Sequence, residues 1–203
     1  MNKPNDKHIA VLDLETTGRY PEKGTIIEIG VCLLDIETNF KSVLLDTLVR
    51  EQNFETKFEA PRLDQCWVFQ NSTINIDMVR QAPTWEEVMP KIQKILNFFP
   101  VTAYNKAFDF SFLRSRGVRI PKELPCPMLA ATPVMKIPKI NPISDRDPYK
   151  WPSVQELWHY FNPSDTKYSE THRAYDDAAH EAELVHFLYK SNAWKPIQEN
   201  QRF

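Results

Sequence analysis

The strongest constraint on the fold is a pair of apolar runs near the start of the chain. Residues 26–34 read Ile-Ile-Glu-Ile-Gly-Val-Cys-Leu-Leu, and residues 9–14 form a second run interrupted only by Asp13. Runs this continuous are typical of strands buried on both faces, because a strand with one wet face alternates apolar and polar residues. We therefore expect strands at residues 8–14 and 26–35, and a third at about residues 40–50, in an α/β fold.

Helical patterns follow these strands. Thr84 and Glu87 form a capping-box pattern, and apolar residues then recur at helical spacing until Pro100. A short strand is predicted over residues 101–104, followed directly by a helix that ends near Gly117, a residue that favours helix termination.

The second half of the chain is predicted to be helical and rich in proline. We expect helices over residues 153–161 and 174–189, the latter strongly amphipathic. A length of 203 residues suits one well-buried α/β domain. We interpret residues 1–203 as a single domain with its core at about residues 8–190 and an ordered proline-rich insertion at about residues 121–152.

Composition excludes some classes of protein. The chain is 42% hydrophobic and 26% charged, with a formal net charge of −2. This balance argues against a broad basic surface that coats nucleic acid, but it is compatible with an enzyme that binds only a strand end. No apolar run of about 18 residues is present, so we expect no membrane-spanning segment.

The expected compartment is the cytoplasm. Residues 1–7 are polar and lack the apolar core of a signal peptide. The three cysteines, Cys32, Cys66 and Cys126, are an odd number without metal-ligand spacing. They are typical of reduced thiols in a cytoplasmic protein.

Two carboxylates lie at the end of the first predicted strand. Asp13 and Glu15 are two residues apart, so their side chains project from the same face of the strand. Two carboxylates on one face repel each other and lose solvation unless a cation lies between them. Hard oxygen ligands suit Mg²⁺ or Mn²⁺.

A third acid, Asp109, lies in the first turn of the helix that follows residues 101–104. Its neighbours one turn on, Phe112 and Leu113, place the carboxylate on the apolar side of that helix. A buried carboxylate is costly unless it is paired or ligated. The alternative is an N-terminal acid stabilised by the helix dipole.

The fourth acid is one of two adjacent aspartates in the last helix. At about 100° per residue, Asp177 falls close to the phase of Leu184 and Leu188, whereas Asp176 points outward. We therefore choose Asp177 as the inward ligand. His172 precedes this helix and is placed to approach a metal-bound water, while the remaining histidines are assigned surface or packing roles: His8, His159, His180 and His186.

Together these residues predict phosphodiester hydrolysis. Four carboxylates at one edge of a sheet can hold two divalent ions about 3.5–4 Å apart, which stabilise the attacking and departing oxygens. A nearby histidine can take a proton from the attacking water.

A group of basic residues beyond residue 105 is either a solvated helix face or a phosphate-binding rim: Lys106, Arg114, Arg116, Arg119 and Lys122.

The ordered motifs resemble those of the DEDDh exonuclease family, the group that contains the proofreading subunit of bacterial DNA polymerase III. The matching segments are Asp13-Leu14-Glu15-Thr16-Thr17-Gly18, Asn105-x-x-Phe108-Asp109-x-x-Phe112-Leu113 and His172-x-Ala174-x-x-Asp177. The spacing of the third motif also selects Asp177 over Asp176. The resemblance covers roughly residues 8–190, and the proline-rich segment is longer than in a compact member of the family.

The resemblance implies an RNase H-like fold with a central mixed five-stranded sheet flanked by helices. It implies 3′→5′ release of nucleoside 5′-monophosphates with two Mg²⁺ or Mn²⁺ ions. By this analogy four acids bind metal (Asp13, Glu15, Asp109 and Asp177), His172 is the general base, and Thr16 contacts the terminal nucleotide. Lys106 is a further substrate-binding candidate from the basic set, and Phe108 is an aromatic on which a free base can stack.

The substrate and partners stay open at this point. Single-stranded DNA 3′ ends are the leading expectation, and an exoribonuclease or oligoribonuclease that trims RNA is the main rival. A catalytically inactive nucleic-acid-binding module is a third alternative, although every acid and the histidine are retained. A DNA polymerase or a repair protein is a candidate partner.

Overall fold

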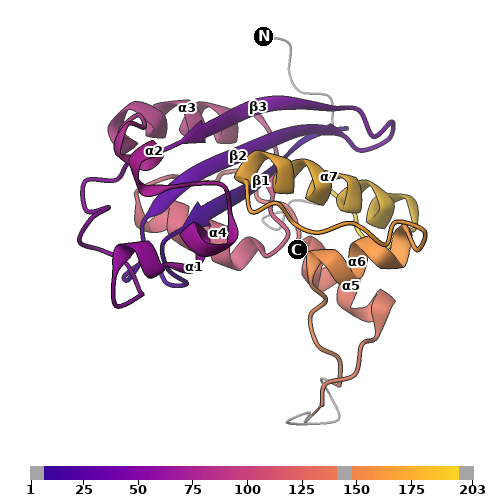
Figure 1. Ribbon diagram of the computed structural model, residues 1–203. Helices are drawn as coiled ribbons and strands as arrows, with labels where there is room; N and C mark the ends of the chain where they lie inside the picture. Colours follow the sequence, from indigo (N-terminus) through magenta and orange to yellow (C-terminus); the bar gives the residue numbers. More distant parts are fainter. Residues whose placement is uncertain (1–6, 141–147, 197–203) are drawn as a thin grey trace.

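A mixed sheet forms the centre of the protein. The computed structural model describes residues 7–140 and 148–196. The strand order is β3 (Lys41–Leu48), β2 (Ile26–Asp35), β1 (His8–Thr16) and β4 (Val101–Thr102). The first three strands form an antiparallel meander (Figure 1). Strand β4 pairs in parallel with β1. The two apolar runs are thus the central strands, as predicted from their continuous hydrophobicity.

The described part of the sheet has four strands, and the expectation of five is wrong. At the position beyond β4, Glu123 forms a single parallel bridge with Val101. Two hydrogen bonds hold this bridge: Val101 N donates to Lys122 O, and Leu124 N donates to Val101 O, both at 2.9 Å. Prolines at positions 121 and 125 flank this segment. Proline has no N–H to donate to a ladder, so the pairing does not extend into a strand.

Helices cover both faces of the sheet. One core contains Ile9 and Val11 of β1, packed against α5 (Pro127–Met135), α6 (Val154–Phe161) and α7 (Ala174–Lys190). The other contains Leu12 and Leu14, packed against α3 (Trp85–Phe98) and α4 (Lys106–Ser115). Successive residues of a strand point to opposite faces. Asp13 therefore shares the face of Ile9 and Val11, toward α7.

Three short helical segments lie beside the start of β2. These are η1 (Leu63–Gln65), α1 (Trp67–Asn71) and α2 (Ile76–Arg80). They form a third apolar cluster with Ile27 of β2, to which Cys66, Val68 and Val79 contribute. This segment borders the cavity described below.

The predicted helices are present with bounds close to those expected. The capping box at α3 is confirmed, because Thr84 N donates to Glu87 Oε2 at 2.8 Å. In the proline-rich segment, α5 begins at Pro127, and Pro138 and Tyr149 form an antiparallel bridge. Residues 141–147 of the predicted ordered insertion lie outside the described residues.

Within the described ranges no helix has the length and apolar character needed to cross a membrane. Cys32, Cys66 and Cys126 are all buried and form no disulfide.

Candidate active site

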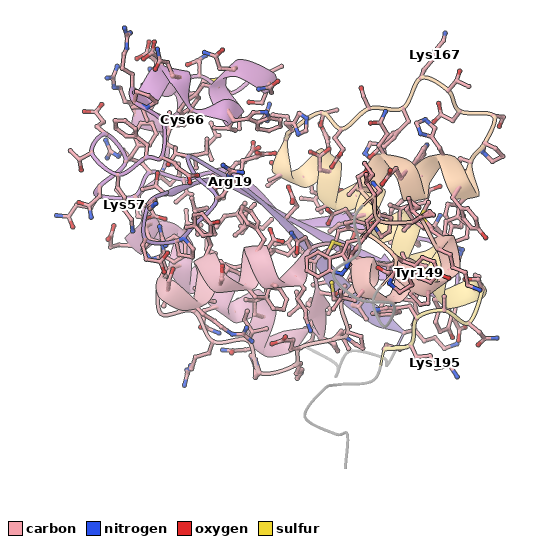
Figure 2. The ribbon with its side chains drawn as sticks, turned by 90° about the horizontal axis from the view of Figure 1, so that it is seen from below. Arg19, Lys57, Cys66, Tyr149, Lys167 and Lys195 are labelled. Carbon is pink, nitrogen blue, oxygen red and sulfur yellow. The ribbon has the colours of Figure 1, made fainter. Side chains whose placement is uncertain are left out.

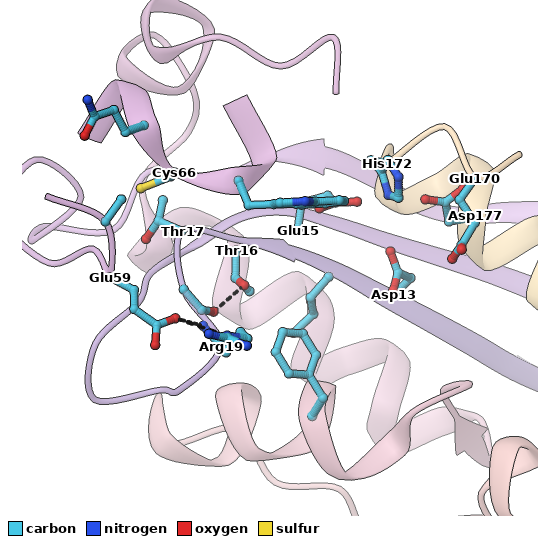
Figure 3. Close-up of a pocket in the computed structure, with 16 residues that line it drawn as sticks. Asp13, Glu15, Thr16, Thr17, Arg19, Glu59, Cys66, Glu170, His172 and Asp177 are labelled. Carbon is cyan, nitrogen blue, oxygen red and sulfur yellow. Dashed lines mark hydrogen bonds and ion pairs between the residues drawn. The ribbon is translucent and has the colours of Figure 1, made fainter. Parts of the chain in front are cut away.

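The predicted site residues meet at one end of the sheet. Asp13 and Glu15 come from the last part of β1, Asp177 from the first turn of α7, and His172 from the loop before α7. Figure 3 shows these four side chains, with Glu170, grouped at one end of a cavity. The cavity has a volume of about 750 Å³. Asp109, in the first turn of α4, is only 3% exposed and is not among the residues that line it.

A backbone irregularity lies beside the two β1 carboxylates. The register between β1 and β2 shifts between Glu15 and Thr16. Such a bulge bends a strand and re-aims its side chains. Thr16 lines the cavity, and its Oγ1 donates to Gly18 O at 2.8 Å, which stabilises the turn that leaves β1.

His172 lies next to two of the carboxylates. One potential ligand atom from each of Glu15, His172 and Asp177 falls within 4.8 Å of the others. Thr171 N and Thr171 Oγ1 donate to Asp177 Oδ1 at 3.1 and 3.3 Å, which orients this carboxylate. Asp177 is buried and Asp176 is exposed, so the burial predicted from helical phase is confirmed.

The carboxyl groups are poorly solvated and close to one another. Burial, followed by the charge of Asp177, raises the pKa of Glu15 to about 8. Burial raises the pKa of Asp109 to about 8 and that of Asp177 above its ordinary value. The pKa of Asp13 lies well above its ordinary value because of burial and the neighbouring acids. Each of these groups would be stabilised as a carboxylate by a cation among them.

Asp109 gives a direct indication of such a cation. Its Oδ1 is buried and has no hydrogen-bond partner among the described residues. A buried polar atom of this kind is normally satisfied, so an orphan is expected where a ligand belongs. The donors in this group are carboxylate oxygens and one imidazole, which suit Mg²⁺ or Mn²⁺ and lack the thiolates of a structural zinc site.

Two further acids join this group, and the sequence analysis did not find them. Glu181 is buried on α7 one turn after Asp177, and its Oε2 accepts a hydrogen bond from Tyr104 N at 3.2 Å. Glu170 lines the cavity, and burial and Asp177 raise its pKa to about 7. The helical phase that selected Asp177 also selects Glu181, whereas Glu170 lies in a loop without periodicity.

Aromatic side chains form part of the cavity wall. Phe108, at the start of α4, lines the cavity. Trp67 of α1 also lines it, and its ring lies edge-on to the His172 ring with 4.6 Å between centroids. No sequence motif marked Trp67, because its place in the wall depends on how α1 packs against β2.

The other end of the cavity is polar. Arg19 and Glu59 lie there, and Arg19 N donates to Glu59 Oε2 at 2.7 Å (Figure 3). The Arg19 side chain is 86% exposed. Figure 2 shows Arg19 on the side of the molecule that carries Cys66, away from Tyr149 of the proline-rich segment.

The predicted basic rim requires correction. Lys106 is buried, and its Nζ donates to Leu124 O and contacts Glu123 Oε1, both at 2.9 Å. Arg116 contacts Glu51 at 3.0 Å. Arg114 pairs with Glu123, and Lys122 Nζ donates to Phe98 O. Within the described ranges, no member of the basic set lines the cavity: Lys106, Arg114, Arg116, Arg119 and Lys122.

Lys106 is thus not brought to the cavity, because its ammonium group neutralises Glu123 in the segment beside β4. Arg19 is the arginine that lines the cavity in the described structure.

The other histidines have contacts consistent with packing. The ring nitrogens of His180 and His186 lie 2.8 Å from the carbonyl oxygens of Asp176 and Ile36, respectively. His159 packs near the ring of Tyr168. His8 lies 3.8 Å from a carboxylate oxygen of Asp35.

The sequence matches a known family over most of its length. The family profile RNase_T, described as an exonuclease, matches residues 10–185. The chain is 27% identical over 190 residues to a PolC-type DNA polymerase III of Clostridium perfringens, covering 91% of this chain and 11% of that protein. It is 31% identical over 113 residues to the 3′-5′ exonuclease DinG of Staphylococcus saprophyticus, covering 52% of this chain and 10% of that protein.

The fold is also found in solved structures. The nuclease domain of 3′hExo, a DEDDh family member bound to rAMP, superposes with a TM-score of 0.62 at 14% identity, covering 94% of this chain and 96% of that one. Cell-death related nuclease 4 gives a TM-score of 0.63 at 12% identity, covering 91% of this chain and 64% of that one. These neighbours confirm the RNase H-like α/β fold.

The chain spans about a tenth of the length of the curated relatives that it matches. The match nevertheless covers the whole region that carries Asp13, Asp109 and Asp177. It agrees with the resemblance that the three motifs indicate: this chain belongs to the RNase_T exonuclease family, in accord with a DEDDh assignment.

Proposed function

We propose that this chain is a divalent-metal-dependent exonuclease that removes nucleoside 5′-monophosphates from the 3′ ends of nucleic acid. The observation that carries this proposal is the group of buried carboxylates beside His172 in a cavity. Family membership supports the reaction class. We propose residues 1–203 as one exonuclease domain, since the matched region spans most of the chain.

The carboxylates of four residues would hold two Mg²⁺ or Mn²⁺ ions: Asp13, Glu15, Asp109 and Asp177. The unsatisfied Oδ1 of Asp109 and the raised pKa values of this group fit that role. Bound cations of this kind supply a lowered pKa for the attacking water and charge that stabilises the departing oxygen. Thr171 fixes the Asp177 carboxylate by two hydrogen bonds to Oδ1.

His172 is the proposed general base. Its ring lies in the cavity next to Glu15 and Asp177, where it accepts the proton of the attacking water. The Trp67 ring borders the imidazole and limits the positions that it can take.

The cavity volume of about 750 Å³ lies in the range of small-ligand sites, which suits a terminal nucleotide. Phe108 and Trp67 offer aromatic faces for base stacking, a contact that tolerates any base. Thr16 is proposed to contact the terminal nucleotide. We leave Lys106 out of the substrate site because its ammonium is bound to Glu123 and Leu124.

Single-stranded DNA is the proposed substrate, ahead of RNA. A net charge of −2 offers little to hold a long duplex, and opening each terminal pair costs a few kcal/mol. Curated relatives named as PolC-type DNA polymerase III support DNA, and a partner polymerase or repair protein. A solved neighbour named for recognition of a histone mRNA stem-loop keeps an RNA-trimming enzyme as the alternative.

A catalytically inactive module is the least supported alternative, because all four acids and His172 are present. We propose the cytoplasm as the compartment on the basis of the three unpaired cysteines.

The test is digestion of 5′-labelled single-stranded DNA, RNA of the same sequence and blunt duplex DNA. We expect a shrinking ladder from the 3′ end with Mg²⁺ or Mn²⁺, fastest on single-stranded DNA, and no digestion in EDTA. Asp109→Asn is the matched inactive control. Full activity in excess chelator would contradict the metal assignment. Rapid RNA digestion with inert DNA would overturn the substrate preference alone.

A further inference from the structure

We propose that Glu28 and Arg173 form a latch that positions His172 for proton transfer. This inference rests on the proposed function, because it assigns a role to residues that support the general base. Neither residue lines the cavity, so the latch acts through His172 and not through contact with the substrate.

The latch joins the central strand to the residue that follows His172. Glu28 lies on β2 and is only 1% exposed. Its Oε1 accepts hydrogen bonds from Arg173 Nη2 at 2.6 Å and Nε at 3.0 Å, and its Oε2 accepts one from Ala174 N at 2.8 Å. A buried carboxylate with this many charge-assisted bonds has a fixed geometry. Both the Arg173 side chain and the backbone at the start of α7 are therefore held against β2.

A close backbone approach removes the remaining freedom on this side. A Cβ placed on Gly30 of β2 would lie 2.1 Å from the carbonyl carbon and oxygen of Ala174. The backbone directly after Arg173 thus rests on β2 with no side chain between them. On the other side of His172, Thr171 N donates to Asp177 Oδ1 at 3.1 Å. The residues on both sides of His172 are consequently anchored.

His172 itself has a backbone conformation that needs such anchoring. Its φ is +53°, in the left-handed region that non-glycine residues rarely occupy. Conformations of this kind persist where surrounding contacts determine them, and they cluster at functional sites. The contacts of the latch hold His172 in this left-handed conformation.

Arg173 also contacts the segment that follows α1. Its Nη1 donates to Thr73 Oγ1 at 3.2 Å, in the segment that follows α1. Helix α1 itself carries Trp67, whose ring contacts the His172 ring. One guanidinium therefore connects β2, the loop of His172 and the segment directly after the helix that carries Trp67. A planar guanidinium with several donors suits this three-way contact, which a lysine cannot reproduce.

The expected consequence is an effect on turnover. Misplacement of a catalytic group by about 1 Å can cost on the order of 10²-fold in rate. Arg173→Met should therefore lower kcat by roughly 10- to 100-fold. KM and the Mg²⁺ concentration for half-maximal activity should stay within about twofold, because Asp177 keeps its two hydrogen bonds from Thr171 and neither Glu28 nor Arg173 lines the cavity.

The decisive measurement is the same substitution in a His172→Ala background. If the latch acts through His172, Arg173→Met should cause no further loss of kcat when the imidazole is already absent. An equal loss in both backgrounds would overturn the proposal, as would a change confined to KM or to Mg²⁺ dependence. Arg173→Lys should give an intermediate kcat.

A second variant separates positioning from stability. Arg173→Met leaves the Glu28 charge buried and unpaired, which is destabilising, whereas Glu28→Gln with Arg173→Met removes both charges. We expect the double variant to recover the wild-type Tm while kcat stays low. Recovery of kcat together with Tm would show that the pair is only structural.

The control is Glu183→Gln, which breaks the 2.6 Å Lys41–Glu183 pair between β3 and α7. It should leave kcat within about twofold.

A readout without substrate keeps this test independent of the proposed function. The ¹H–¹³C NMR signal of the His172 ring should be single in the wild type and broadened or multiple in Arg173→Met. An unchanged ring signal in the variant would overturn the latch. A wild-type chain that digests no 3′ end would overturn the proposed function and leave this measurement intact.

Discussion

At the scale of single residues, Asp176 and Asp177 show how one position along a helix changes the role of the same side chain. Asp177 is buried and its Oδ1 accepts two hydrogen bonds from Thr171, whereas Asp176 is exposed. The two residues therefore have the same side chain and differ only in the direction in which it points from the helix.

Asp177→Asn should abolish most activity, and Asp176→Asn should leave it within about twofold. Removing a residue that only hydrogen-bonds to a metal ligand usually costs about 10- to 100-fold in activity. Removing the ligand itself should cost more, so we expect kcat to fall by at least about 100-fold. The measurement is kcat on single-stranded DNA at saturating Mg²⁺. Similar mild losses from both substitutions would show that Asp177 is not a ligand.

His172→Ala should slow turnover by roughly 10²–10⁴-fold, the range for loss of a general base. Substrate binding should change little, because Phe108 and Trp67 still line the cavity. Single-turnover rates with separately measured DNA affinity would check this. A variant that keeps the wild-type rate would assign proton removal to another group.

At the scale of elements, the contact between α7 and β2 places the third motif over the first. Gly30 permits this contact, because any side chain there would meet the backbone of Ala174 at 2.1 Å. The first turn of α7 can then bring Asp177 within reach of Glu15. The position of the site therefore depends on a residue that takes no part in the chemistry.

Gly30→Ala should lower both stability and activity. The added methyl group must displace α7 or bend β2, and overpacking of this kind costs about 1–3 kcal/mol or more. Thermal unfolding and kcat of the same preparation would measure the two effects. The control is Val43→Ala on the neighbouring strand β3, where the residue is 56% exposed; it should change neither stability nor kcat appreciably. Wild-type stability in Gly30→Ala would contradict the close approach.

At the scale of the whole molecule, the carboxylate group connects β1, α4 and α7. The pKa of both Glu15 and Asp109 is raised to about 8 by burial. In the unfolded chain these carboxyl groups have pKa values of about 4 and lose their protons above that pH. Without a cation, the folded chain keeps these protons up to about pH 8. The free energy of unfolding should then fall as pH rises from about 4 to about 8.

Added Mg²⁺ should reverse this trend, because metal binding requires deprotonated ligands. We expect Mg²⁺ to raise Tm more at pH 8 than at pH 6, measured by thermal unfolding in EDTA and in excess Mg²⁺. A chain with both Asp13→Asn and Asp109→Asn should lose most of this difference. An equal Mg²⁺ effect at both pH values would argue against cation binding at these carboxylates.

The sequence by itself determined the features that depend on neighbouring residues. The central place of β1 and β2 follows from uninterrupted apolar runs, the common face of Asp13 and Glu15 from the strand period, and the burial of Asp177 from the helix period. The capping box of α3 also follows from residues three positions apart. These signals are local, so they can be read before any tertiary contact is known.

Only the tertiary structure decided the features that join distant segments. Glu123 takes the Lys106 ammonium that the sequence assigned to substrate, and flanking prolines reduce the expected fifth strand to a bridge. Glu28 and Arg173 lie 145 positions apart, yet they meet because Gly30 lets α7 rest on β2. Periodicity fixes which way a side chain points from its own element. Which partner it meets is set by how the elements pack, and that information is not local.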